Sequence, residues 1–143
     1  MDAGYASTPL WKKLGLKPGT SAQLVDAPDG WTVPNPPPEV RWLDESGSSA
    51  DVVVAFYRTA VGVMPGLVDL GKRVYPNGAV WAAWPRKAAG HMSDIDENLL
   101  RNCALALGMV DVKVAALDVD WSGLKVVWRR ENRRDWALTA KRP

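Results

Sequence analysis

Residues 79–130 place an apolar strand, a helix, a second strand and a returning strand in direct succession. This order restricts the fold more than any other part of the 143-residue chain. Pro85 ends the first strand because it has no N–H to continue a sheet ladder. Ser93 is predicted to cap the helix, with Asp96 three residues later in a capping-box arrangement, and Gly108 to end it. A strand, a helix and a further strand in this order form a right-handed crossover between parallel strands, so the segment predicts an α/β sheet.

The predicted helix presents one apolar stripe, made of residues spaced four apart: Ile95, Leu99, Cys103 and Leu107. Cys103 is the single cysteine, so it forms no internal disulfide, and its place on the stripe indicates a core residue. Residues 110–117 predict the next strand. A tight turn at residues 120–123 then leads to a returning strand at residues 124–129.

Three strands are predicted before residue 79. Residues 51–57 are apolar on both faces, which is typical of a central strand covered on two sides. Shorter strands are expected at residues 22–25 and 39–43. The stretch between them carries four prolines, which exclude a helix or a central strand: Pro34, Pro36, Pro37 and Pro38.

Two helices complete the pattern. The first has Thr8 as its N-cap and Pro9 at its first helical position, and it ends at Gly15. The second is expected over residues 65–74, with a buried face made of Leu67, Leu70 and Val74. Together these elements predict an α/β fold of three layers, Rossmann-like, with a mostly parallel twisted sheet and an antiparallel C-terminal strand.

Length and charge predict a single domain over residues 1–143, with a loose N-terminus at residues 1–7 and a basic end at residues 131–143. The net charge of +2 is too small to attract nucleic acid or a membrane over a long range. Because no run of about 18 apolar residues and no basic-then-apolar leader is found, we expect no membrane span and a cytoplasmic location. The eight tryptophans fit core and edge packing, or a groove or homodimer interface.

Residues 51–130 resemble the second half of a class I methyltransferase, in which a helix and a strand precede an antiparallel returning strand. The resemblance implies a Rossmann-like sheet, and in that family the first strand leads into a glycine-rich turn that lets the backbone approach the cofactor. The corresponding residues here, 24–30, contain Pro28 and a single glycine, and the proline run follows them. We therefore expect a truncated methyltransferase-like fold without a cofactor, in which S-adenosylmethionine is disfavoured.

Motifs along most of the chain also resemble an uncharacterised bacterial domain-of-unknown-function family (DUF3052-like). The motifs that carry this resemblance are Thr8-Pro9-Leu10, Lys13-Leu14-Gly15, Trp84-Pro85-Arg86-Lys87, Gly90, Asp94, residues 110–114 and residues 121–125. The resemblance implies a small cytoplasmic bacterial protein. The family has no assigned activity, so it supplies no catalytic residues.

Ligands of open parallel sheets lie beyond the carboxyl ends of the strands. The predicted strands place seven side chains at such a rim: Asp26, Asp29, Arg58, Trp84, Asp118, Asp120 and Trp121. The start of the helix after Ser93 is expected at the same edge, so this rim is where a ligand is predicted.

The most specific local prediction is an anion site in the loop between the 79–84 strand and the following helix. Its residues are Arg86, Lys87, Gly90, His91 and Ser93. Two cations and free backbone N–H groups near a helix start favour a phosphate or a carboxylate. The alternative is that Arg86 and Lys87 are solvated or pair with the carboxylates that follow the next strand.

Other chemistry has less support in the sequence. His91 with Asp118 and Asp120 can be interpreted as an acid–base set, although aspartates also suit a turn between strands. The chain has no His/Cys pair at metal spacing, so no metal site is predicted. Ser122 lacks the sharp strand-to-helix turn of a hydrolase nucleophile.

The sequence therefore favours a binding or regulatory module, and no catalytic residue is assigned. The enzymatic alternative is a methyltransferase-like or other transferase acting on an anionic substrate, with Arg86, Lys87, Asp118 and Trp121 at its site. A third alternative is nucleic-acid binding through the basic C-terminal end, with Trp128 and Trp136 among its residues. No protein partner is identified.

Overall fold

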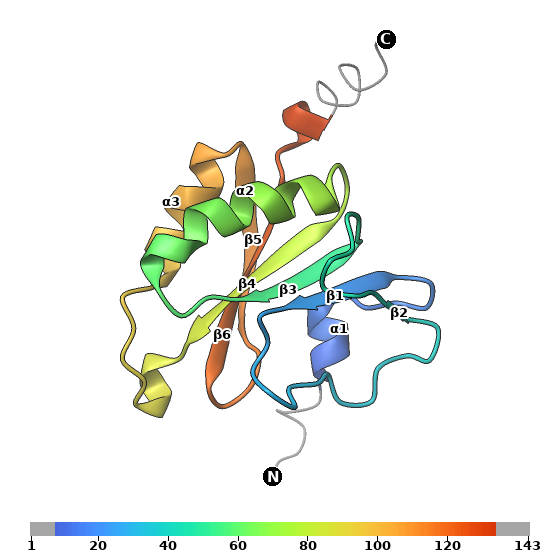
Figure 1. Cartoon of the computed structure of the whole chain (residues 1–143), viewed down its shortest axis with the longest axis horizontal. Coiled ribbons are helices and arrows are strands. Elements are labelled where there is room, and N and C mark those ends of the chain that lie inside the picture. The colour runs from blue at the N-terminus through green and yellow to red at the C-terminus, as the bar shows by residue number, and fades with distance from the viewer. Residues whose placement is uncertain (1–7, 134–143) are drawn as a thin grey trace.

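The computed structural model describes residues 8–133 and contains one six-stranded sheet with helices on both faces. Figure 1 shows the element order. The strands are β1 (Ser21–Val25), β2 (Arg41–Trp42), β3 (Val52–Phe56), β4 (Ala79–Pro85), β5 (Met109–Ala116) and β6 (Trp121–Trp128), and the helices are α1 (Leu10–Leu14), α2 (Val63–Val74) and α3 (Glu97–Ala106). Short 3-10 turns at Ala60–Gly62 and Lys87–Ala89 precede α2 and α3.

The sheet has the order β2-β1-β3-β4-β6-β5. The first four strands are parallel, and β6 pairs antiparallel with both β4 and β5. The chain moves from β1 outward to β2 and then returns to the other side of β1 to form β3. This reversal creates a topological switch point between β1 and β3. The predicted mostly parallel α/β sheet with an antiparallel C-terminal strand is confirmed.

Two hydrophobic cores lie on the two faces of the sheet. On one face, α2 and α3 bury Leu67, Leu70 and Leu100 against β3, β4 and β6. On the other face, α1 and the proline-rich connection cover the sheet with Leu14 and Val33. Figure 1 shows α2 and α3 in front of the sheet and α1 behind it. The second helical layer is thin, because a loop takes the place of a helix between β1 and β2.

The boundaries of three predicted elements are corrected. Pro9, not Thr8, is the N-cap of α1, and it makes no side-chain capping bond. Helix α2 begins at Val63, two residues before the predicted start. Strand β6 begins at Trp121, so Ser122 lies within a strand, paired with Trp84 and Ala116. The turn of this hairpin spans residues 117–120 rather than 120–123.

Helix α3 differs most from its prediction. Its N-cap is Asp96, whose Oδ1 accepts a hydrogen bond from the Leu99 N–H at 2.9 Å. Ser93 lies before the helix, where its Oγ accepts from the Ile95 N–H. The buried face also differs from the predicted stripe, since Leu100 and Ala104 are the fully buried helical residues. Leu99, Cys103 and Leu107 are only partly buried.

Candidate functional site

The predicted rim exists, because β1, β3, β4 and β5 all point their carboxyl ends to one edge of the sheet. Asp26 and Asp29 follow β1, Arg58 follows β3, and Asp118 and Asp120 lie in the β5–β6 turn. Trp84 is near the end of β4, but its side chain is buried in the core beneath α2 and α3. It therefore does not contribute a surface to the rim.

Arg58 connects two parts of this rim. Its Nη1 donates to the backbone oxygen of Asp26 at 2.9 Å, and its Cζ lies 5.4 Å from the ring centroid of Trp121. The ring of Trp121 is itself held by an edge-to-face contact with Phe56, which makes a second such contact with Trp31. These contacts fix the guanidinium between the loop after β1 and the β5–β6 hairpin.

The predicted anion loop is largely occupied by contacts to the same hairpin. Arg86 donates to the backbone oxygens of Asp118 and Val119, at 3.3 and 2.9 Å. The Nε2 of His91 lies 2.8 Å from Oδ1 of Asp120. The side chain of Lys87 is exposed and makes no hydrogen bond or ion pair within residues 8–133.

Two further features of this loop bear on the prediction. Gly90 has φ of 87° and closes the 3-10 turn at Lys87–Ala89. Because α3 starts at Glu97, Ser93 does not present a helix N-terminus to this loop. Arg86 follows the predicted alternative in that it bonds to the hairpin, although through backbone oxygens rather than carboxylates. Anion binding by this loop stays a prediction.

Between Arg58 and His91 lies an open pocket of about 320 Å³, which we call the hairpin pocket. Pro28, Pro85, Asp120 and Trp121 complete its wall. The pocket brings together three of the predicted rim residues and His91 of the predicted anion loop. Its His91–Asp120 pair is the arrangement that an acid–base role requires.

A second pocket lies at the switch point, at the carboxyl ends of β1 and β3, and has a volume of about 350 Å³. We call it the switch-point pocket. Its wall is built from the ends of both strands and the first turns of α2. Among the residues that line it are Asp26, Tyr57, Arg58, Gly66 and Asp69. The size suits a small molecule. Asp26 and Arg58 were predicted as rim residues, whereas the others were not.

Tyr57 is the chemically most distinctive of the pocket residues that the sequence did not predict. Its side chain is 9% exposed, and its hydroxyl has no hydrogen-bond partner within residues 8–133. The ring fits against Gly66 of α2, where a Cβ atom would lie 2.6 Å from the hydroxyl. Burial, with the nearby charges of Asp26 and Asp69, raises the pKa of Tyr57 above its ordinary value. The hydroxyl therefore stays protonated and able to donate a hydrogen bond at neutral pH.

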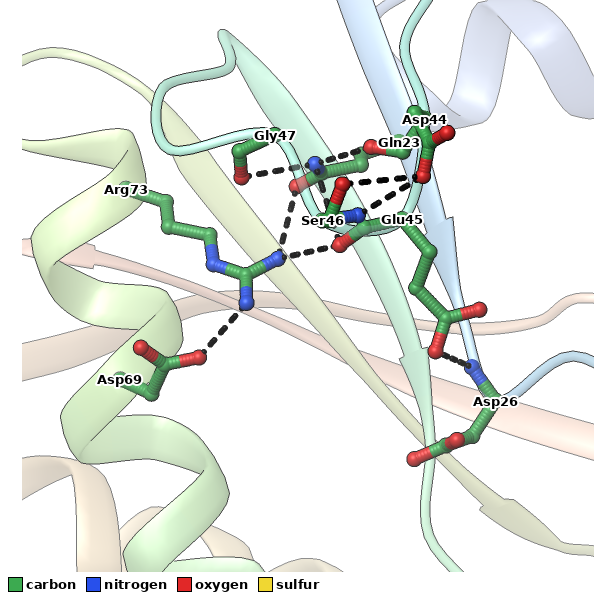
Figure 2. Close-up of polar contacts among 8 residues, drawn as sticks. All are labelled: Gln23, Asp26, Asp44, Glu45, Ser46, Gly47, Asp69 and Arg73. Carbon is green, nitrogen blue, oxygen red and sulfur yellow. Dashed lines mark hydrogen bonds and ion pairs between the residues drawn. The ribbon is translucent and has the colours of Figure 1, made fainter.

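A polar network at the edge of this pocket joins the carboxylate of Asp69 to the backbone of Asp26, as Figure 2 shows. Asp69 pairs with Nη2 of Arg73 at 2.8 Å, and Nη1 of Arg73 donates to the backbone oxygen of Glu45 at 2.9 Å. The carboxylate of Glu45 accepts from the Asp26 N–H at 3.4 Å. Asp26 itself has φ of 58°, a left-handed conformation that aspartate adopts more readily than most residues.

The turn after β1 does not reproduce the cofactor seat of a methyltransferase. Ala27 and Pro28 follow Asp26, and no helix lies between β1 and β2. Close backbone approach to a cofactor needs glycines, and anchoring at a helix N-terminus needs a helix there. The residues present therefore do not fit the glycine-turn seat for S-adenosylmethionine.

Two further kinds of site are absent from the described part of the chain. Residues 8–133 contain no group of three or more His, Cys, Asp or Glu side chains arranged to hold a metal ion. None of their helices is both long and apolar enough to span a membrane.

Comparison with known proteins shows a fold and no family. No protein-family model matches the sequence, and no curated protein matches it either. A chain in the crystal structure of a fibrillarin/Nop5p complex matches the structure with a TM-score of 0.50 at 10% sequence identity. The match covers 84% of this chain and 83% of that chain. At this identity the likeness shows the fold alone, and this chain therefore has a methyltransferase-like Rossmann fold.

Proposed function

We propose that this protein is a methyltransferase-like Rossmann module that binds a small polar molecule in the switch-point pocket and does not use S-adenosylmethionine. The observation that carries the proposal is the buried Tyr57 hydroxyl, which lacks a partner among the described residues. Leaving such a group unsatisfied costs roughly 1–3 kcal/mol. A ligand that accepts a hydrogen bond from Tyr57 would recover this free energy.

The position of the pocket supports the same proposal. Ligands of doubly wound sheets bind in the crevice at the switch point, and this pocket opens between the ends of β1 and β3. The carboxylates of Asp26 and Asp69 offer acceptors to hydroxyl or amino groups, and Arg58 offers donors. This mixture favours a small molecule that carries both donors and acceptors.

Three features of the sequence analysis complete the proposal. We infer a cytoplasmic protein, because the motifs shared with the DUF3052-like bacterial family imply one. We place it with the DUF3052-like bacterial family on the motifs quoted above. A regulatory role follows if the ligand is sensed without being converted, since no catalytic residue has been assigned.

Ligand-observed NMR with a panel of amino acids, sugars and nucleosides tests the binding site. Compounds that bind the wild-type protein are expected to lose their signal with Tyr57→Phe and to keep it with His91→Gln, which changes only the hairpin pocket. The proposal fails if no compound binds at millimolar concentration, or if every compound that binds does so equally well to Tyr57→Phe. In a separate calorimetric titration, micromolar binding of S-adenosylmethionine would contradict the cofactor-free part of the proposal.

A further inference from the structure

A third pocket lies at the amino edge of the sheet, opposite the rim, and has a volume of about 290 Å³. It is formed where the chain leaves α1 and where β3 and β4 begin, beside the end of β6. Its polar wall consists of Lys17, Thr20, Asp51, Asn77 and Lys125. We call it the lysine pocket. None of these residues is part of the rim or of the switch-point pocket.

A β-bulge places a third lysine, Lys113, opposite Lys125 and just outside the wall of the lysine pocket. In β5, Asp111 pairs with Val126, but Lys113 pairs with Lys125, so the register shifts at Val112. Without the shift, Lys113 would oppose Leu124, whose side chain lies in the core under α3. The bulge instead turns Lys113 toward the face of Lys125. Bulges commonly redirect a side chain in this way near functional sites.

The resulting arrangement is unfavourable in the absence of a counter-ion. Lys113 and Lys125 are opposite each other in an antiparallel pair, and like charges at such positions destabilise the sheet. Burial, and then the charges of Lys113 and Lys17, lower the pKa of Lys125. Lys113 and Lys17 therefore both lie close enough to Lys125 to repel its ammonium group.

The chain itself offers these lysines no ion pair within residues 8–133. Asp51 is the carboxylate in the wall, and its Oδ2 accepts a hydrogen bond from the Ser21 N–H at 3.0 Å. Thr20 accepts from the Lys17 N–H through Oγ1, which leaves its O–H free to donate. Donors thus outnumber acceptors on the wall.

We propose that the lysine pocket binds a compact oxyanion of the phosphate class. Lysine ammonium groups are common phosphate ligands, and the hydroxyl of Thr20 and the amide of Asn77 supply neutral donors beside them. The bound oxyanion offsets the repulsion between Lys113 and Lys125. This site goes beyond the proposed function, because it lies at the other edge of the sheet and shares no residue with the switch-point pocket.

Calorimetric titration of the full chain with sodium pyrophosphate, at low and constant ionic strength, tests this site. Saturable binding is expected for the wild-type protein. Lys125→Gln is expected to weaken it about tenfold, because it removes one charge-assisted hydrogen bond. Lys113→Gln is expected to weaken it less, because Lys113 lies opposite Lys125 but outside the pocket wall and contributes only its charge. Lys72→Gln is the matched control, since this exposed lysine lies on α2 and its removal is expected to leave the affinity unchanged.

Three results would overturn the proposal: no saturable binding to the wild-type protein, equal binding to the Lys113→Gln/Lys125→Gln double variant, or equal loss in Lys72→Gln. Loss of binding in Arg86→Ala/Lys87→Ala would also overturn it, because the anion would then sit in the loop before α3. Thermal unfolding separates these outcomes from misfolding, since without anion the double variant should unfold at a temperature no lower than wild type. Tighter binding of a single-stranded oligonucleotide than of pyrophosphate would contradict a free compound as the ligand.

Discussion

The hydroxyl of Tyr57 places a polar atom in the core without a partner among the described residues, and its removal has a predictable sign. Tyr57→Phe is expected to raise the free energy of unfolding of the ligand-free protein by about 1 kcal/mol, because it removes an unsatisfied group and keeps the ring. Tyr75→Phe is the matched control. The hydroxyl of Tyr75 lies within hydrogen-bond reach of the backbone oxygens of Asn132 and Arg133, so its loss should lower stability by about 1 kcal/mol.

Urea unfolding of the two variants measures both values. A Tyr57→Phe variant that loses as much stability as Tyr75→Phe would mean that the Tyr57 hydroxyl is satisfied in solution. A gain in stability combined with a loss of ligand binding would show that the site retains a group that costs stability, as functional sites commonly do.

The start of α3 shows how two equally good capping residues compete at the scale of an element. Ser93 and Asp96 are both favoured N-caps, and the sequence pattern alone favoured Ser93. In the structure Asp96 makes the capping bond. Asp96→Ala is therefore expected to lower the free energy of unfolding by about 1 kcal/mol. Ser93→Ala should lower it by less than half as much, because its Oγ accepts only from the Ile95 N–H outside the helix.

Urea unfolding of the two variants, compared with wild type, checks this order. If Ser93→Ala is as costly as Asp96→Ala, then in solution the helix begins nearer to the predicted residue.

Helix α2, predicted over residues 65–74, is continuous from Val63 to Val74 although it contains Gly66 and Gly71. The glycines serve packing. A Cβ at Gly66 would lie 2.6 Å from the Tyr57 ring, and one at Gly71 would lie 3.2 Å from Trp128. Helix propensity describes the local cost of a glycine, but it does not describe which side chain from another element needs the space.

For the whole molecule, local patterns were sufficient to predict the sheet. The apolar strand at residues 51–57 and the strand at 79–84 correspond closely to β3 and β4. The switch-point pocket and the lysine pocket were not predicted, because each joins segments far apart in the sequence. Tyr57 ends an apolar strand and resembles any buried strand residue. The register shift that places Lys113 opposite Lys125 depends on the pairing of two strands, which no single segment encodes.

Gln23 of β1 is fully buried and binds the connection between β2 and β3. Its Nε2 donates to the backbone oxygens of Asp44 and Gly47, at 2.7 and 2.9 Å, and its Oε1 accepts from Arg73 of α2 at 3.3 Å. Figure 2 shows how these bonds join the loop, a central strand and a helix. Gln23→Leu would leave the Gly47 carbonyl and part of the Arg73 guanidinium without partners, and it would remove one of the two donors to the Asp44 carbonyl.

Gln23→Leu is therefore expected to lower the free energy of unfolding by about 2–4 kcal/mol and to speed amide exchange in residues 43–50. Asp69→Asn is the control, because it breaks only the exposed pair with Arg73 and should cost less than about 0.5 kcal/mol. Urea unfolding and hydrogen–deuterium exchange measure the two effects. If Gln23→Leu and Asp69→Asn had the same effect on the free energy of unfolding and on amide exchange, contacts within residues 43–50 would be sufficient to hold the loop. A large effect would mean that the edge of the switch-point pocket depends on Gln23, since the same loop positions Asp26 through Glu45.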